Sequence, residues 1–448
     1  MVLCQGWFFV NIYRNEYGCD SVTVLISLQK RAPMTTHHQT TENTTKLQST
    51  GPLAGLKVVE FTSVVLGPWA TQTLGDLGAD VIKVEAPRGD SNRNMGEFHH
   101  HDDMKALYLT SNRNKRCIVL DIKQPEGLKA ALKLCEDADI VVHNQRPQAI
   151  EKLGLGYKDI CKVNPSVIYC GSYGYSKDGP YGDRSAMDDA IQAASGIAML
   201  MQEVYGEPRY LPTVVADKTT AMAVVQAILA ALFHRERSGE GQEIEVPMFE
   251  TMVHWMMCEH SWGQTFEPAK GHAGYDRIME KGRKPFKTKD GYLAVLPYLD
   301  HHWTVFAELA DAPELTTNPD FTDMKSRLKH GAAMNAAVAD VLTRKTSEEW
   351  LELLKPTSIP HMRVNSLDDL FDDPHLAATG YFEQHSHPTE GTYKLTKGPF
   401  NFSKTPTSIR RLPPRFGEHS REILMEHGYN ADEIEKLAAQ KTFLTPKE

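Results

Sequence analysis

The stretch Leu56-Lys-Val-Val-Glu-Phe61 is a short, mainly apolar run that predicts a buried strand. Residues 68–77 predict a helix after it, and Asp80-Val-Ile-Lys-Val-Glu85 predicts a second strand of the same kind. A strand, a helix and a strand joined by short turns form a unit whose two strands run parallel. This part of the sequence therefore predicts an α/β fold built on a parallel sheet.

The same alternation continues along the chain. Further elements are predicted as strands at 116–121, 139–143 and 165–171 and as a helix at 126–138. Helices between parallel strands cover both faces of a sheet. The expected fold class is therefore α/β, with a doubly wound, mostly parallel, Rossmann-like large domain. Such sheets bind ligands outside the carboxyl ends of their strands, so the site is expected there.

A smaller α/β domain is expected later in the chain, after two long helices predicted at 217–236 and 248–263. Its first strand is Gly291-Tyr-Leu-Ala-Val-Leu296. Helices are then predicted near 302–310, 325–344 and 347–355 and from Arg421 onward.

Composition narrows the class of protein. The 448 residues carry a formal net charge of −9, which gives no electrostatic reason to expect nucleic acid or an anionic membrane as a partner. The seven cysteines are scattered without a Cys-x-x-Cys pair, as in reduced thiols of a cytoplasmic protein. No apolar run long enough for a membrane span is expected. We therefore predict a cytoplasmic protein.

Residues 1–51 are expected to be a disordered or non-native N-terminal extension. Residues 35–50 are mostly small polar residues and histidines that cannot bury a core, and Met34 is an alternative start. The apolar run at 2–10 lacks the basic residues and cleavage site of a secretory signal. Glu16 argues against a mitochondrial presequence.

Asp217 stands directly before the long apolar helix and is expected to be its N-cap. The free amides and the helix dipole at that position are expected to lower the pKa of its carboxyl group. Asp is among the commonest N-caps, so the position alone does not distinguish a capping residue from a catalytic one.

Short phrases in a fixed order connect residues 52–435 to a known family. They include Gly55-Leu-Lys-Val-Val-Glu-Phe-Thr62, Gly67-Pro68, Leu77-Gly-Ala-Asp-Val-Ile-Lys-Val-Glu-Ala-Pro87, Asn144-Gln-Arg-Pro147, Gln192-Ala-Ala-Ser-Gly196, Pro285-Phe-Lys-Thr-Lys-Asp-Gly291 and Gly417-Glu-His419. In this order and spacing the phrases resemble the class III CoA-transferases. That family includes carnitine CoA-transferase, bile-acid-inducible protein F and formyl-CoA transferase.

The resemblance implies a role for Asp217. In the family, one Asp at the head of the helix before a His-Arg-Glu/Lys turn is the nucleophile, and Asp217 matches it. CoA would move between an acyl-CoA thioester and a free carboxylic acid through an aspartyl mixed anhydride and an aspartyl-CoA thioester. This covalent route needs no metal and no cofactor beyond the CoA substrate. Backbone amides beside Asp217 are expected to stabilise the oxyanions.

The resemblance also implies a CoA-binding site on loops after the predicted strands. Its expected residues are Val64, Val65, Arg88, Leu120, Lys123, Asn144, Gln145, Arg146 and Lys152. Arg88 suits a phosphate, although the family's basic residue often stands two positions earlier, where this chain has Ala86. Arg146 and Lys152 are also consistent with solvated surface charges.

Racemases and epimerases of the same family are the nearest alternative. They carry Gly-His-Asp where this chain has Ala186-Met187-Asp188. Met187 cannot move a proton, so the second base of a racemase is missing and transfer is favoured. Asp188 and Asp189 are interpreted as ordinary helix-start acids without a catalytic role.

Two other segments bear on the substrate and on metal binding. Gly271-His-Ala-Gly274 is a weak match to the glycine flap of formyl-CoA transferases, so formate and oxalate are doubtful substrates. His99-His-His-Asp-Asp103 lacks the usual spacing of metal ligands and is interpreted as a solvated loop.

Two alternatives belong to other functional classes. The protein could be a nicotinamide-dependent dehydrogenase or a non-catalytic CoA-binding protein. The first strand-to-helix turn, Thr62-Ser-Val-Val-Leu-Gly-Pro68, lacks the glycine pattern of dinucleotide-binding folds. The resemblance implies an intertwined homodimer whose partners are an acyl-CoA and a small carboxylic acid; the acid itself is left open. The expected large CoA-binding domain spans 52–263, and a linker follows at 264–284. The small domain is expected at 285–376, and a C-terminal segment at 377–448 is expected to return to the large domain.

Overall fold

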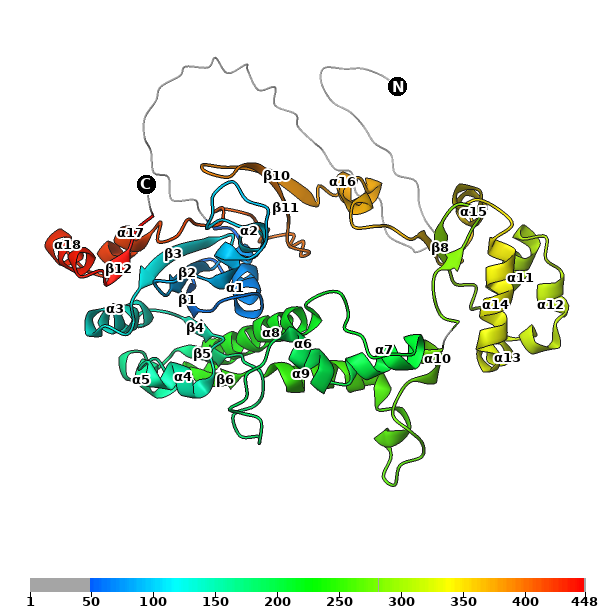
Figure 1. Cartoon of the computed structure of the whole chain (residues 1–448), viewed down its shortest axis with the longest axis horizontal. Helices are drawn as coiled ribbons and strands as arrows, with labels where there is room; N and C mark the ends of the chain where they lie inside the picture. The colour runs from blue at the N-terminus through cyan, green and yellow to red at the C-terminus, as the bar shows by residue number, and fades with distance from the viewer. Residues whose placement is uncertain (1–48, 281, 447–448) are drawn as a thin grey trace, which may run out of the picture. The chain divides into compact units, whose positions relative to one another are not determined.

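The computed structural model describes residues 49–280 and 282–446, so the predicted N-terminal extension lies outside the described residues apart from 49–51. Its largest sheet has seven strands in the order β12-β3-β2-β1-β4-β5-β6 (Figure 1). The strands are β1 (Lys57–Phe61), β2 (Asp80–Glu85), β3 (Lys115–Leu120), β4 (Ile140–His143), β5 (Ile168–Gly171), β6 (Gln242–Glu245) and β12 (Phe443–Leu444). All neighbours pair in parallel except β12, which is antiparallel to β3. The predicted mixed α/β class with a mostly parallel sheet is confirmed.

The chain reverses its direction of travel across the sheet at β1. Strands β1, β2 and β3 run outward to one side, and β4, β5 and β6 then continue on the other side of β1. The loops after β1 and β4 therefore leave the sheet on opposite faces and open a crevice between them.

Alternate residues of the strands build two separate cores. Val58 and Val142 belong to the first core, whereas their neighbours Val59 and Val141 belong to the second. The first core holds helices α1 (Leu66–Asp76), α6 (Asp188–Ala194), α8 (Val215–Ser238) and α9 (Met248–His260). The second holds α3 (Pro125–Cys135), α5 (Tyr157–Val163), α17 (Ser420–Glu426) and α18 (Ala431–Ala439). Both faces are covered, because a strand in a parallel sheet alternates its side chains between two apolar layers.

A third core is built from residues between Phe286 and Ile359. Its sheet consists of β7 (Phe286–Lys287), β8 (Tyr292–Val295) and β9 (His361–Arg363), and all of its pairings are antiparallel. Helices α11 (Asp300–Leu309), α13 (Met324–Lys329), α14 (Gly331–Leu342) and α15 (Ser347–Leu354) accompany this sheet (Figure 1). The single helix predicted at 325–344 is wrong, because the chain leaves the helical conformation at His330, directly before Gly331.

The helix α8 has two apolar faces. Among the described helices it is long and apolar enough to cross a membrane by length and composition, with a mean hydropathy of 1.4. One face of α8 is buried in the first core, through residues such as Val224 and Ile228. The other face leaves Met222 57% and Phe233 65% exposed. The helix is thus apolar on two sides, of which this chain covers one.

Candidate active site

A cleft lies at the carboxyl ends of β1 and β2, beside the loop after β4. Its volume is about 480 Å³. It is lined by Phe61, Thr62, Ser63, Val84, Glu85, Ala86, Arg88, Gly89, Asp90, Ser91, Asn94 and Gln145. This is the edge of the sheet where the strand order predicted a ligand site. Of the predicted CoA-binding residues, Arg88 and Gln145 line it directly.

The loop between β1 and α1 is strained at Val64, whose φ is +70°. A β-branched residue in this left-handed region is a genuine outlier, because its Cβ approaches the backbone too closely. Such strain persists only where the surroundings hold the conformation. The predicted residues Val64 and Val65 therefore form a shaped loop beside the cleft, and Val65 is buried as the N-cap of α1.

Three side chains hold this loop in place. The Asp90 carboxylate accepts a hydrogen bond from the Val64 amide at 3.1 Å, and the Asn92 side chain donates to the Val64 carbonyl. Asn144 does the same for Ser63, accepting from its amide at 3.1 Å and donating to its carbonyl at 2.7 Å. Asp90 is 2% exposed and Asn92 is fully buried, so their bonds are sheltered from water. Asn144 was predicted as a ligand contact; the structure makes it a brace of the loop, and sequence reasoning missed Asp90 and Asn92.

The remaining predicted CoA-binding residues lie outside the cleft lining. Leu120 is fully buried in the second core, so its side chain packs within the protein. Lys123 and Lys152 are exposed, the second as the last residue of α4 (Pro147–Lys152). Arg146 is exposed and donates to the Asp183 carbonyl at 3.0 Å. The structure thus gathers Val64, Arg88, Asn144 and Gln145 around one cleft, whereas the other four are exposed elsewhere or buried in the core.

Behind the cleft lies a buried network of charges. Lys83 reaches Asp90 at 2.8 Å, and Lys115 reaches Glu60 at 2.8 Å, with all four side chains buried. Glu85, which also lines the cleft, pairs with Arg93 at 2.8 Å.

Paired cations decide the protonation of Glu85. Burial by itself raises the pKa of Glu85, but Arg93 and then Lys83 outweigh it and lower the pKa to about 2. Every acid of the network therefore has a cation within ion-pair distance, the arrangement that makes buried charges tolerable.

Asp217 lies in the first turn of α8, but not where the sequence predicted. The helix begins at Val215 and its N-cap is Val214, so Asp217 is the third helical residue and the predicted N-cap is wrong. Residues 213–215 turn into the helix through backbone bonds, because the Val215 amide donates to the Thr213 carbonyl at 2.8 Å. The helix therefore begins two residues earlier than its apolar pattern indicated.

The acid that caps α8 is Asp188, the first residue of α6. Its Oδ1 accepts hydrogen bonds from the amides of Ala216 at 2.7 Å and Asp217 at 3.0 Å. Backbone amides beside Asp217 were predicted to stabilise oxyanions, and the structure shows that two of them, those of Ala216 and Asp217, are bonded to Asp188. Asp188 is buried, whereas Asp189 in the same turn is exposed, so the interpretation of both as ordinary helix-start acids holds only for Asp189.

The pKa of Asp217 moves in the opposite direction to the prediction. Burial first, and the nearby Asp188 charge second, raise the pKa of Asp217 to about 7. The helix dipole does not prevent this, because its positive end is neutralised by Asp188 rather than by Asp217. Among the described residues, Asp217 forms no ion pair with Lys, Arg or His. It is a partly buried carboxyl group that titrates near neutrality, as groups at functional sites often do.

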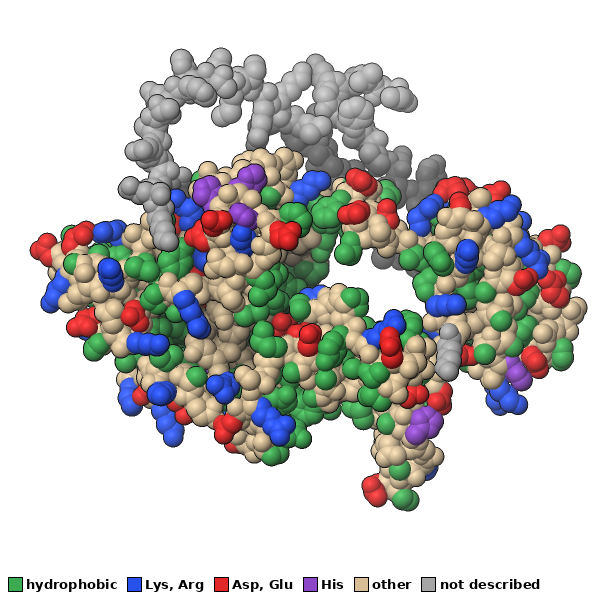
Figure 2. All heavy atoms as spheres, viewed as in Figure 1, with side chains coloured by type: hydrophobic (Ala, Val, Ile, Leu, Met, Phe, Trp, Pro, Cys, Tyr) green, Lys and Arg blue, Asp and Glu red, His purple; other side chains and the backbone are tan. Residues whose placement is uncertain are grey.

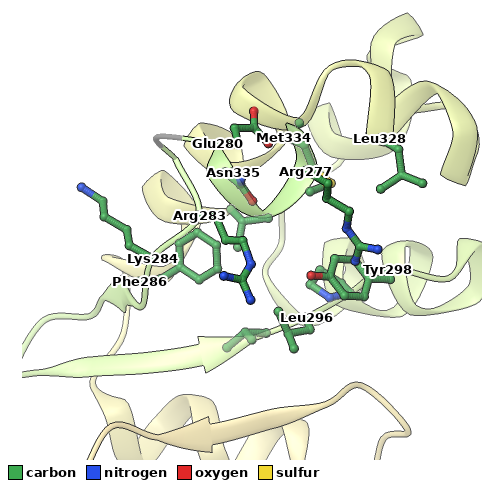
Figure 3. Close-up of a pocket in the computed structure, with 14 residues that line it drawn as sticks. Arg277, Glu280, Arg283, Lys284, Phe286, Leu296, Tyr298, Leu328, Met334 and Asn335 are labelled. Atoms are coloured by element: carbon green, nitrogen blue, oxygen red, sulfur yellow. The ribbon is translucent and has the colours of Figure 1, made fainter. Parts of the chain in front are cut away.

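A second cavity lies in the part of the chain that carries the third core. Figure 3 shows Arg277 reaching over Tyr298, at 4.5 Å from the ring, while Lys284 points away from the cavity. Phe286 and Met334 contribute to an apolar wall. None of the predicted site residues lines this cavity, so the site is assigned to the cleft at the large sheet and to the head of α8.

Comparison with known proteins identifies the family. Residues 53–420 match the family model described as CoA-transferase family III. The chain belongs to CoA-transferase family III.

Relatives of this family III CoA-transferase share its length and architecture. It is 33% identical over 396 residues to succinyl-CoA:glutarate CoA-transferase of Mus musculus, a match that covers 86% of this chain and 89% of the relative. It is 30% identical over 391 residues to succinyl-CoA:mesaconate CoA-transferase of Haloarcula marismortui, covering 84% and 97%. The crystal structure of a CAIB/BAIF family protein from Brucella suis superposes with a TM-score of 0.74 at 30% identity, covering 85% of this chain and all of that one. The family III CoA-transferase is thus an enzyme that transfers CoA.

Proposed function

We propose that the enzyme moves CoA between an acyl-CoA thioester and a free carboxylic acid with Asp217 as the covalent nucleophile. The observation that carries this proposal is the state of Asp217: a partly buried carboxyl group at the head of a long helix, without a cation pairing it among the described residues. A structural acid in such a place would be paired. An unpaired one, with a pKa near neutrality, remains basic and reactive.

The chemistry proceeds by four exchanges. The Asp217 carboxylate attacks the thioester carbonyl and the carbon–sulfur bond breaks. CoA departs as its thiolate, and a mixed anhydride of Asp217 and the donor acid remains. The thiolate attacks the Asp217 carbonyl, releasing the donor acid and forming an aspartyl-CoA thioester. The acceptor carboxylate attacks that thioester, expelling the thiolate again. The thiolate finally attacks the acceptor's carbonyl, which frees the acyl-CoA product and restores Asp217. Each step exchanges one activated acyl group for another, so ATP is not consumed.

We place CoA in the cleft beside β1 and β2. Arg88 is exposed at its edge and offers a cation for a phosphate, while the strained Val64 loop presents fixed backbone. The exposed Lys123, Arg146 and Lys152 are proposed to contact more distant parts of CoA, whereas the fully buried Leu120 supports this region from the core. The proposal assigns no metal and no further cofactor.

For the acids, we propose succinyl-CoA as donor and a short dicarboxylic acid as acceptor. Several relatives are named for such pairs: succinyl-CoA with glutarate in Mus musculus and succinyl-CoA with mesaconate in Haloarcula marismortui. A panel of dicarboxylates and monocarboxylates of equal length, assayed by chromatography of the CoA thioesters, distinguishes them. A preference for monocarboxylates contradicts this assignment while leaving the transfer mechanism intact.

The test of the nucleophile is covalent trapping. Wild-type enzyme incubated with succinyl-CoA and then hydroxylamine should acquire a hydroxamate at Asp217, detected by peptide mass spectrometry. Asp217→Asn should show no trapped species, and its CoA transfer should fall at least about a thousandfold, as for other covalent nucleophiles. Transfer at an undiminished rate in purified Asp217→Asn protein refutes the mechanism.

We also propose a homodimer in the cytoplasm. The exposed face of α8 carries Met222 and Phe233, and α9 adds Trp255 at 49% exposure. Figure 2 shows hydrophobic side chains gathered around the region of α6, α8 and α9. Large exposed apolar patches of this kind mark protein interfaces. Light scattering after gel filtration should give twice the chain mass, and replacing Phe233 with Asp should shift it toward one chain mass.

A further inference from the structure

Two side chains of α6 grip the segment that leads into α8. Asp188 binds the amides of Ala216 and Asp217, as described above. Gln192, one turn further along α6, accepts from the Leu211 amide at 2.9 Å and donates to the Thr213 carbonyl at 3.2 Å. Gln192 also donates to the second Asp188 oxygen at 2.6 Å. Both side chains are buried, at 6% and 1% exposure.

These contacts fix where Asp217 stands. Four backbone groups between Leu211 and Asp217 accept or donate hydrogen bonds in this way, and three of them belong to residues 213–217. Asp188 carries the charge in this arrangement, and Gln192 fixes its orientation. A charged acceptor bonded to backbone amides at a helix start forms a strong and directional contact.

Charged and titratable groups lie on several of the elements packed against the helix of Asp217. The helix α8 packs against α1, α6, α9, β5 and β6. On α1 the charged side chain is Asp76, its last residue, which is paired with Arg113. On α9 and β6 the titratable groups are Glu250, His254, Cys258, Glu259, His260, Glu243 and Glu245, and β5 carries Tyr169 and Cys170. Lys218, the neighbour of Asp217, donates to the Thr213 hydroxyl at 2.5 Å.

Among these groups Asp188 is the one whose charge acts on Asp217, and it adds to burial in raising the pKa of Asp217. The effect has a consequence for the chemistry. When Asp217 is acylated its negative charge disappears, and with it the repulsion from Asp188. A neighbouring anion therefore destabilises the free carboxylate relative to the acyl-enzyme.

We propose that Asp188 is the positioning residue of the transfer reaction: a buried anionic cap that orients Asp217 and favours its acylation. The inference rests on the proposed role of Asp217 as nucleophile. Asp188 itself touches neither substrate nor CoA in this role and acts through Asp217. Met187, 63% exposed at the N-cap of α6, takes no part in it.

The test compares Asp188→Asn with Asp189→Asn, a matched change one residue away on the exposed side of the same turn. Asn caps helices as well as Asp, so the Ala216 and Asp217 amides keep an acceptor while the charge is removed. In wild type, kcat/KM for succinyl-CoA should rise with pH and level off near the Asp217 pKa of about 7. In Asp188→Asn this limb should move down by at least about one pH unit, and the plateau rate should fall about tenfold. Asp189→Asn should leave both unchanged.

Three results decide the matter. An unshifted limb in a folded Asp188→Asn protein overturns the inference, as does an equal shift in Asp189→Asn. If Asp188→Asn does not fold, the pH dependence of hydroxylamine trapping at Asp217 in wild type replaces it, and a limb below about pH 5 overturns the inference. Failure to trap anything at Asp217 contradicts the proposed function instead, so the two failures are distinguishable.

Discussion

Two sets of buried acids in this enzyme are treated in opposite ways. Glu60, Glu85 and Asp90, at the carboxyl edge of the large sheet, each lie within 3.7 Å of a buried cation. Asp217, at the head of α8, has burial and the like charge of Asp188 around it. The pKa of Glu85 is lowered to about 2 while that of Asp217 is raised to about 7, although both groups leave water.

The difference distinguishes an acid that stabilises the fold from an acid that is available for chemistry. Pairing compensates the desolvation of Glu85, so its charge supports the fold and is not available to a substrate. Asp217 lacks that compensation, so its burial as a carboxylate destabilises the fold, and it keeps the basicity that the proposed nucleophilic role requires.

The largest expected effect comes from breaking a paired acid. Glu85→Gln leaves Arg93 buried without its carboxylate and should lower the free energy of unfolding by about 3–5 kcal/mol. Asp217→Asn removes an uncompensated charge and should leave stability unchanged or raise it. Urea unfolding followed by circular dichroism at one protein concentration measures both. Equal losses in the two variants would erase the comparison.

The pH dependence of stability should have opposite signs at the two sites. The folded-state pKa of Asp217, about 7, is above its unfolded value of 3.8, so its contribution is complete below about pH 4 and is lost as pH rises to about 7. The folded-state pKa of Glu85, about 2, is below 4.5, so its contribution is present above about pH 4.5 and is lost as pH falls toward 2.

The measurement is a difference between variants. Wild type minus Asp217→Asn should lose stability from pH 4 to 7, by up to roughly 4 kcal/mol. Wild type minus Glu85→Gln should instead lose stability below about pH 4.5. A flat Asp217 difference curve between pH 4 and 7 is incompatible with the raised pKa.

A smaller effect is expected for the side chain that holds the strained loop beside the cleft. Asp90 and Asn92 hold Val64 at a positive φ, so Asn92→Ala should cost about 1–3 kcal/mol by leaving the Val64 carbonyl unpaired. Gly adopts that conformation without strain, so Val64→Gly should recover about 1 kcal/mol of the loss in the double variant. Thermal unfolding of the four proteins gives the coupling. Strict additivity would mean that Asn92 does not hold the strain.

The smallest effect is expected for an ion pair on the surface. Lys133 and Glu136 pair on α3 with their side chains 45% and 42% exposed. Because water and salt screen this pair, Lys133→Ala should leave the free energy of unfolding unchanged within the error of the measurement. A destabilisation as large as that of Glu85→Gln would show that the contribution of an ion pair to stability does not depend on its burial in this protein.

Much of the fold follows from local sequence. The strand at Asp80–Glu85 was predicted with its observed bounds, because a short, mainly apolar run between turn residues is typical of a buried strand. The break at His330 was not predicted, because the apolar spacing continues through it from one helix to the next.

For the site, the sequence by itself determined that Asp217 heads a long apolar helix and that Arg88 and Gln145 follow strands of a parallel sheet. Periodicity and strand ends carry that information locally. Only the tertiary structure decided the protonation of Asp217 and its contact with Asp188, which is 29 residues away in the chain. A pKa depends on burial and on charges brought together by folding, and no local pattern encodes either.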